Sequence, residues 1–196
     1  GELEDFETFT LIIDAVNDAP VLATIDNVSF DEEGSGSISL SGSDVDGDDL
    51  TYSITGGDQI TATLDGSDVS FSAPLNFNGS EEFSVSVTDD EYTDSQSFTV
   101  TINAVNDAPV ANVASATMFE DQSVVITLSG SDIDGDNLTY SLDTDASNGS
   151  VVLDGNLATY TPTADFNGDD SFIFSVSDGD LSDTAEGTLT ITAVND

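Results

Sequence analysis

The chain of 196 residues contains no Lys, Arg, His, Cys or Trp. The missing cysteines exclude disulfides and thiolate metal sites, and the missing histidines exclude an imidazole base and the usual zinc sites. Without Lys or Arg, no side chain can neutralise phosphates, which excludes nucleic acid as a partner and attraction to anionic lipid. The chain also lacks a run of about 18 apolar residues, so direct membrane insertion is not expected.

In place of these residues the chain has 40 Asp and Glu, a formal net charge of −40, and 37% hydrophobic residues. Such a charge density opposes a compact state unless cations from outside the chain neutralise it. The acids gather in short motifs, which favours bound metal ions over an evenly solvated acidic surface. Catalysis is not expected, because only carboxylates are available and they lie in turn motifs.

The sequence repeats itself with a period of 89 residues. The string Ala-Val-Asn-Asp-Ala-Pro-Val occupies 15–21 and 104–110, an offset of 89 (104 − 15). The Asp-x-Asp-Gly-Asp motif lies at 44–48 and again at 132–136, so the second copy lacks one residue before this motif. The expected parts are the last strand of a preceding repeat (1–17), a first repeat (18–106) and a second repeat (107–196).

Within each repeat, hydrophobic residues alternate with Ser and Thr. This alternation predicts strands with one face on a core and the other in water, and Asp-Gly and Asn-Gly pairs mark turns between them. Six or seven short strands per repeat predict an all-β fold of tandem Greek-key β-sandwiches, cadherin-like or Ig-like, placed end to end. The expected core residues include Ile38, Leu40, Tyr52, Val69, Phe71, Phe83, Val85, Val87, Phe98, Val100 and Ile102, then Phe172, Phe174, Val176, Leu189 and Ile191.

The motif Asp44-Val45-Asp46-Gly47-Asp48 places three carboxylates within five residues. Gly47 permits a sharp turn, and the carboxylates repel one another unless a hard cation binds. Calcium, which takes about six to eight oxygen ligands, suits the motif better than magnesium does. The motif is not an EF-hand loop, because Thr55 stands where that loop needs a Glu. A turn capped by its own aspartates is the alternative interpretation.

Two further groups of oxygen donors are expected beside this motif. The linkers 17–20 and 106–109 both read Asn-Asp-Ala-Pro, and the loop before the last strand carries Asp89 in one repeat and Asp178 in the other. In a Greek-key sandwich that loop, the Asp44 loop and the incoming linker lie at one end. Carboxylates that are distant in the sequence should therefore meet at each junction.

Several strings together resemble the bacterial cadherin-like repeats of large secreted surface adhesins. They are Asp132-Ile133-Asp134-Gly135-Asp136-Asn137-Leu138-Thr139-Tyr140, Tyr160-Thr161-Pro162-Thr163-Ala164-Asp165-Phe166-Asn167-Gly168, Phe172-Ile173-Phe174-Ser175-Val176-Ser177-Asp178-Gly179 and the Val-Asn-Asp-Ala-Pro linkers. The resemblance covers essentially the whole chain. It implies an extracellular, cell-surface protein in which Ca²⁺ between successive repeats stiffens a spacer that holds an adhesive tip away from the cell.

The resemblance also implies a set of calcium ligands at each junction. The linker, the Asp-x-Asp loop and the last loop contribute, together with an acid that follows the first strand of the preceding repeat. At the internal junction these are Asn106, Asp107, Asp132, Asp134 and Asp178 with Glu32, for which Asp31 and Glu33 are alternatives. At the first junction they are Asn17, Asp18, Asp44, Asp46 and Asp89, a weaker site without its preceding repeat, and Glu120 is the second repeat's equivalent of Glu32.

Neighbouring repeats of the same chain are the expected partners. The alternative function is a module that binds a cell-surface carbohydrate or protein, homophilic binding included, for which Tyr92 and Phe6 are candidate exposed aromatics. The segment 1–17 is apolar at Leu3, Phe6, Phe9, Leu11 and Ile13. Because a strand without a sheet tends to pair with another chain, a strand-mediated dimer through residues 1–17 is a further expectation.

Overall fold

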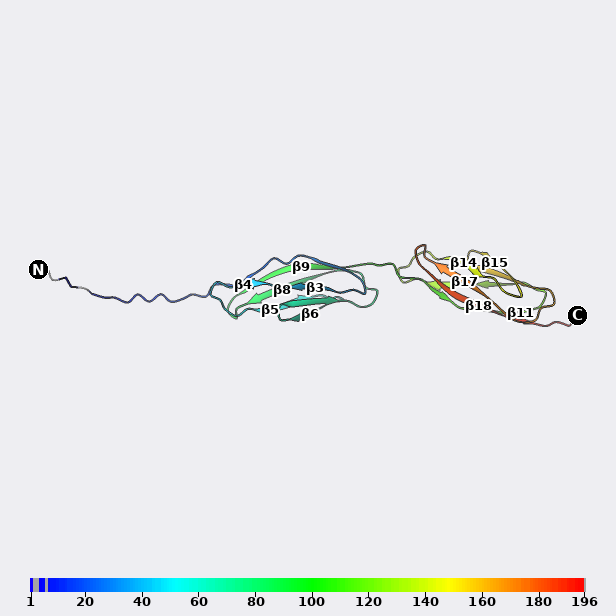
Figure 1. Ribbon diagram of the computed structural model, residues 1–196, viewed down its shortest axis with the longest axis horizontal. Helices are drawn as coiled ribbons and strands as arrows, with labels where there is room; N and C mark the ends of the chain where they lie inside the picture. The colour runs from blue at the N-terminus through cyan, green and yellow to red at the C-terminus, as the bar shows by residue number, and fades with distance from the viewer. Residues whose placement is uncertain (2–3, 6, 196) are drawn as a thin grey trace. The chain divides into compact units, whose positions relative to one another are not determined.

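The computed structural model describes residues 1, 4–5 and 7–195. The chain divides into two compact units, Gly1–Val105 and Asn106–Asp196, and each contains a β-sandwich (Figure 1). Among the described residues, no helix has the length and apolar character needed to span a membrane. That residues 1–17 are the last strand of a preceding repeat stays a prediction, and Leu3 and Phe6 lie outside the described residues.

The first unit packs a four-stranded sheet against a three-stranded sheet. The order of the larger sheet is β2-β9-β8-β5, with β2 parallel to β9 and the other pairs antiparallel. The smaller sheet has the order β3-β7-β6, and β1 pairs with β4. The strands are β1 (Val21–Leu22), β2 (Val28–Asp31), β3 (Gly36–Ser39), β4 (Gly42–Ser43), β5 (Thr51–Gly56), β6 (Thr61–Asp65), β7 (Asp68–Ser72), β8 (Gly79–Thr88) and β9 (Thr93–Asn103).

The second unit repeats this topology. Its sheets have the orders β11-β18-β17-β14 and β12-β16-β15, β11 is parallel to β18, and β10 pairs with β13. The strands are β10 (Val110–Asn112), β11 (Ala114–Phe119), β12 (Val124–Thr127), β13 (Ser129–Ser131), β14 (Thr139–Thr144), β15 (Gly149–Asp154), β16 (Leu157–Pro162), β17 (Gly168–Ser177) and β18 (Ser182–Thr192).

The described residues of each unit form nine strands where six or seven were expected, because the first two long strands of each sandwich are broken in two. In the first unit β1 pairs with β4. The chain then crosses to the larger sheet, where β2 pairs with β9. The crossing ties the two sheets together at one edge. The predicted all-β fold of two tandem Ig-like or cadherin-like sandwiches is confirmed.

The alternating apolar residues point into a core between the two sheets of each unit, as predicted. In the first unit Phe71, Phe83 and Phe98 are buried, with ring centroids 5.4, 6.0 and 6.1 Å apart. In the second unit Gly187 takes the position of Phe98, 89 residues on, and a Cβ there would lie 2.2 Å from the ring of Phe172. The two copies therefore fill the same space with different sets of side chains.

Candidate metal centres

Each Asp-x-Asp-Gly-Asp loop turns sharply at its glycine. Gly47 has φ 83° and Gly135 has φ 81°, a left-handed conformation that glycine adopts without strain. In the first unit, Oδ1 of Asp44 accepts the backbone N–H groups of Asp46, Gly47 and Asp48 at 2.8, 3.0 and 3.3 Å. The self-capped turn foreseen as the alternative therefore accounts for one oxygen of Asp44.

The second oxygen of the same carboxylate has another environment. Oδ2 of Asp44 is buried and accepts no hydrogen bond from the described part of the chain, and Oδ2 of Asp132 is in the same situation. Oxygens from the three loop aspartates of each unit lie within 4.8 Å of one another, in Asp44, Asp46 and Asp48 and again in Asp132, Asp134 and Asp136. Since Ca²⁺ binds oxygens at about 2.3–2.6 Å, oxygens at this spacing can share one ion.

The linker that enters each unit is attached to this loop. The backbone N–H of Asp18 donates to Oδ2 of Asp46 at 2.7 Å. The equivalent N–H of Asp107 donates to Oδ2 of Asp134 at 2.8 Å. In both copies a linker aspartate is thereby placed beside the loop carboxylates, as the sequence predicted for residues that lie 27 or 28 positions apart.

The last loop of the first unit adds Asp89 to the loop and linker aspartates. The side-chain amide of Asn17 donates to Oδ2 of Asp89 at 3.0 Å, and Oδ1 of Asp89 accepts the N–H groups of Glu91 and Tyr92. These hydrogen bonds hold the pKa of Asp89 below its usual value, and the bond from the backbone N–H of Tyr92 has the largest effect. This carboxylate is therefore negatively charged and fixed in place.

The last loop of the second unit has the same arrangement. The side-chain amide of Asn106 donates to Oδ2 of Asp178 at 2.9 Å. The backbone N–H of Leu181 and then the amide of Asn106 hold the pKa of Asp178 below its usual value. The duplicated sequence thus produces a duplicated hydrogen-bond network at one end of each sandwich.

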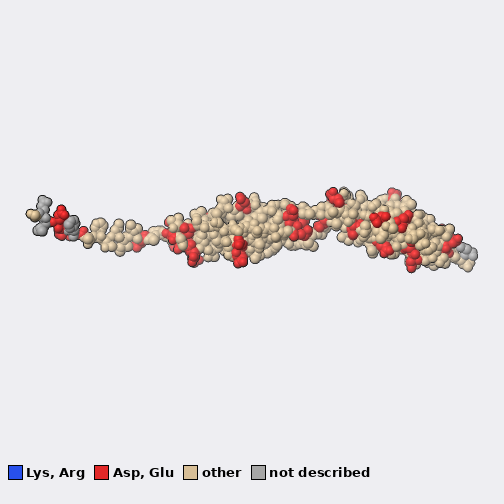
Figure 2. Space-filling model, in the orientation of Figure 1, with Lys and Arg blue, Asp and Glu red and all other residues tan. Residues whose placement is uncertain are grey.

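The carboxylates of the first unit repel one another. Burial, and after it the charges of Asp44, Asp46, Asp89 and Asp49, raise the pKa of Asp48. A bound cation would reverse this effect, because it attracts the charges that now repel. Figure 2 shows the acidic side chains in separate groups on a face without Lys or Arg, so the described side chains include no cation that could neutralise them.

A buried glutamate lies at the opposite end of each sandwich, after β2 or β11. Glu32 is 5% exposed, and its Oε1 accepts the backbone N–H of Val105 at 2.6 Å. Glu120 is also 5% exposed, and its Oε1 accepts the N–H of Val194 at 2.6 Å while its Oε2 accepts the side-chain amide of Asn167. Each glutamate thus holds the residue that precedes an Asn-Asp pair.

The structure brings together ten of the twelve predicted ligands in two groups, one in each unit. The groups are Asn17, Asp18, Asp44, Asp46 and Asp89, and Asn106, Asp107, Asp132, Asp134 and Asp178. Glu32 and Glu120 lie at the other end of their own units, and the assignment of all twelve as ligands stays a prediction. The predicted set omits Asp48 and Asp136, which the Asp-x-Asp-Gly-Asp spacing would have identified and which lie with the other loop aspartates.

Fold and repeat pattern define the class of this chain as tandem Ig-like or cadherin-like β-sandwich domains. A family profile described as "Bacterial Ig domain" matches residues 17–103 and 106–192. The chain therefore belongs to the bacterial Ig domain family and contains two copies of the domain. No curated protein matches it.

The solved structures that this chain is similar to include a cadherin with the same fold. Human protocadherin-24 EC1-2 has a TM-score of 0.59 and 17% identity over 91% of this chain and 100% of that chain, which shows the fold alone. Drosophila N-cadherin EC1-4 has a TM-score of 0.42 and 15% identity over 92% of this chain and 52% of that one. An endo-fucoidan hydrolase of glycoside hydrolase family 107 has a TM-score of 0.40 and 21% identity over 90% of this chain, which spans 29% of the hydrolase's length.

Proposed function

We propose that these two domains form a calcium-stiffened spacer of a bacterial surface adhesin, which holds an adhesive part of the protein away from the cell. The observation that carries the proposal is the buried Oδ2 of Asp44 and of Asp132, which accepts no hydrogen bond from the described residues. Leaving a buried charged oxygen without a partner is costly. A cation bound by this oxygen and its neighbours would remove that cost.

Calcium fits the available donors. They are carboxylate and amide oxygens, and the chain has no nitrogen or sulfur ligand from His or Cys. Hard oxygen ligands in variable number suit Ca²⁺, whereas Mg²⁺ requires a tighter octahedral shell with several waters. The loop oxygens of each unit lie within 4.8 Å of one another, close enough to bind one Ca²⁺ together.

The linker is the element that a bound ion would stiffen. Val105 is bonded to Glu32 of the first repeat, and the next residue, Asn106, is bonded to Asp178 of the second. Acids from both repeats therefore hold adjacent residues of the linker. Calcium at about 100 times its dissociation constant adds about 2.7 kcal/mol per independent site, a large share of the stability of a small domain.

Localisation outside the cell agrees with this function. Bacterial Ig-like domains usually belong to surface or extracellular proteins. Extracellular calcium modules bind with dissociation constants of about 10⁻⁴–10⁻³ M, so they are loaded only where calcium is abundant. A chain that depends on calcium would stay loosely folded before export and become rigid outside.

The test is X-ray scattering and thermal melting of the chain in calcium and in chelator. Asp44→Asn with Asp132→Asn removes the buried oxygen in both units, and Asp65→Asn with Asp154→Asn, at two hairpin turns, is the control with the same change of charge. We expect calcium to raise the melting temperature and narrow the distribution of interdomain distances in the parent and the control but not in the Asp44/Asp132 variant. If calcium changes neither property in the parent, the acids are a solvated surface.

That second outcome would favour the alternative function, a module that binds a carbohydrate or a protein. Tyr92 is the exposed aromatic residue among the described residues of the last loop and lies beside Asp89. A glycan screen of the parent chain and of Tyr92→Ala separates this function from the spacer, since a spacer requires no ligand at Tyr92.

A further inference from the structure

The two repeats differ on the outer face of their smaller sheets. In the second unit, Val125, Val152 and Leu157 lie on this face and are 59%, 66% and 42% exposed. Val125 and Val152 flank Thr159 in one row across β12, β16 and β15, and Leu157 lies in the next row. The first repeat has polar residues at the equivalent positions, 88 or 89 residues earlier: Ser37, Thr63 and Asp68.

The smaller sheet of the second unit also carries almost no charge. The runs 122–131, 146–153 and 155–164 contain β12, β16 and nearly all of β15, and none of these runs includes an acid. Asp154 lies at the turn between β15 and β16. On a chain with a formal net charge of −40, a neutral surface is where a second copy can approach with the least repulsion.

The strand β12 forms an open edge of this sheet. Among the described residues, β12 pairs with β16 alone, and the N–H of Leu128 donates to the carbonyl of Asn156 on the same side. Alternate residues of an antiparallel strand bond to the same neighbour. The N–H and C=O groups of Ser123, Val125 and Thr127 consequently face away from β16, and such an edge accepts another strand.

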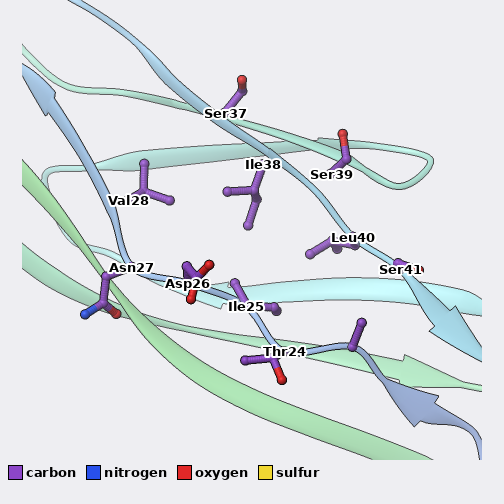
Figure 3. Close-up of a pocket in the computed structure, with 11 residues that line it drawn as sticks. Thr24, Ile25, Asp26, Asn27, Val28, Ser37, Ile38, Ser39, Leu40 and Ser41 are labelled. Atoms are coloured by element: carbon purple, nitrogen blue, oxygen red, sulfur yellow. The ribbon is translucent and has the colours of Figure 1, made fainter.

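In the first repeat a charged segment accompanies the corresponding edge. The edge strand there is β3, and residues 23–28, which lead from β1 into β2, face residues 37–41 across a groove of about 490 Å³ (Figure 3). Asp26 is the charged residue of the groove lining, and charge beside an edge discourages pairing with another strand. In the second repeat Val113 alone separates β10 from β11, and residues 113–119 contain no charge. The edge of β12 therefore lacks this protection.

We propose that two copies of this protein pair through β12 and form a dimer with two-fold symmetry. The two three-stranded sheets then become one continuous sheet. Two antiparallel strands of the same sequence are related by a two-fold axis, so an open edge is complementary to the same edge of a second copy. An axis at Val125 pairs this residue with Val125 of the second copy and Ser123 with Thr127. This register uses all the outward-facing backbone groups of residues 123–127.

A second copy suits this surface better than a basic partner does. A basic partner would be attracted to the acidic loops and not to a neutral edge. A second copy brings the same neutral strand, and it places its Val125 beside the apolar patch that Val125, Val152 and Leu157 form. A single strand pair buries less surface than a standard protein interface, so the expected dimer is weak. The pairing uses no residue of the calcium loops and does not depend on the proposed function.

The test is sedimentation equilibrium of the whole chain at constant calcium, at concentrations up to about 1 mM. Val125→Asp places like charges opposite each other at the axis, and Ser37→Asp, the same change of charge at the equivalent position of the first repeat, is the matched control. Thr127→Pro blocks the edge while sparing the bonds to β16, and Ser39→Pro is its control. We expect the parent and both controls to dimerise, and Val125→Asp and Thr127→Pro to raise the dimer dissociation constant at least about tenfold.

Residue-resolved hydrogen exchange gives a second measurement that does not depend on mass. The amides of Val125 and Thr127 should gain protection as the concentration rises, whereas those of Ser37 and Ser39 should not change. Thermal melting shows whether each variant is folded. Added sodium chloride should strengthen the dimer, because it screens the repulsion between two chains of charge −40.

Three results would overturn the proposal. One is a parent chain that is monomeric up to about 1 mM. Another is a dimer that Val125→Asp and Ser37→Asp weaken equally, or in which the amides of Val125 and Thr127 exchange as they do in the monomer. The third is a dimer that chelator dissociates and Val125→Asp leaves intact, which would place the contact at the acidic loops.

Discussion

Glu32 accepts a hydrogen bond from the backbone N–H of Val105 at 2.6 Å, and with 5% exposure its carboxylate is almost completely buried. Val105 directly precedes Asn106, which is bonded to Asp178 of the second unit. The carboxylate of Glu32 therefore has two separable properties, an oxygen that orders the end of the first repeat and a negative charge beside the linker.

Glu32→Gln and Glu32→Ala separate these properties. Gln keeps the acceptor for Val105 and removes the charge, so in chelator its free energy of unfolding should stay close to that of the parent. Ala leaves the N–H without its acceptor and should cost about 1–3 kcal/mol. In calcium, both variants should lose part of the stabilisation by the ion. Urea unfolding of each variant in chelator and in calcium measures these differences, and a Gln variant that gains as much from calcium as the parent contradicts the assignment of Glu32 as a ligand.

Asp48→Asn should have effects of opposite sign without and with calcium. In chelator the substitution removes a carboxylate whose pKa is raised by burial and by its acidic neighbours, so the melting temperature should rise. In calcium it removes a ligand, so the affinity of the first unit should fall about tenfold or more, since carboxylate count sets the affinity of such sites. Melting curves and calcium titration calorimetry measure the two effects.

Asp65→Asn is the matched control for Asp48→Asn. It removes the same charge from the hairpin turn between β6 and β7, outside the loop cluster. We expect it to leave calcium affinity unchanged. An equal loss of affinity in both variants would mean that net charge, and not coordination by Asp48, determines calcium binding.

The sandwich fold and the composition of the two acidic groups could be predicted because both depend on repeated, regular patterns. Alternation with a period of two places Val85 and Val100 on the core face wherever the strands pair. Asn106 and Asp178 repeat the positions of Asn17 and Asp89. To predict that each pair meets, it was enough to know that the linker and the last loop lie at the same end of the sandwich.

Features set by single contacts between distant residues could not be predicted in the same way. The hydrogen bond from Ile25 to Gln96, which fixes the segment between β1 and β2, joins residues 71 positions apart, and no periodicity indicates it. The same is true of Gly187. From the sequence it is only a residue that weakens a strand, and its close contact with the ring of Phe172 is seen only in the structure. Such contacts depend on the register and depth of packing, which alternation leaves undetermined.

Gly187→Ala should destabilise the second unit by about 1–3 kcal/mol. A Cβ at this position would lie 2.2 Å from the ζ carbon of Phe172, a buried ring that has little room to move. Thr192→Ala, on the outer face of the same strand, is the control and should change the free energy of unfolding by about 0.5 kcal/mol or less. Denaturant unfolding of both variants gives the comparison. Equal stability of Gly187→Ala and the parent would show that the sheet adjusts to admit the methyl group.

Tyr160→Phe should destabilise the second unit at neutral pH and have little effect in acid. The hydroxyl of Tyr160 donates to Oδ2 of Asp170 at 2.9 Å, and Phe71 occupies the same position in the first repeat without a hydroxyl. Burial alone would raise the pKa of Asp170, but the hydrogen bonds from Asn148, Tyr160 and two other N–H groups outweigh burial and lower it. The charged form of Asp170 is thus the one that the fold stabilises.

Because the pKa of Asp170 is lower in the folded state than its ordinary value of 3.8, its contribution is complete above that value. The contribution is lost as the pH falls through the lowered pKa of the folded state. The cost of Tyr160→Phe, about 0.5–1.5 kcal/mol at pH 7, should accordingly shrink on acidification below 3.8. Tyr140→Phe, which removes a half-buried hydroxyl that is not bonded to Asp170, is the control. Urea unfolding from pH 7 downward measures the cost, and a cost that stays constant across this range would show that the hydroxyl does not act through the ionised Asp170.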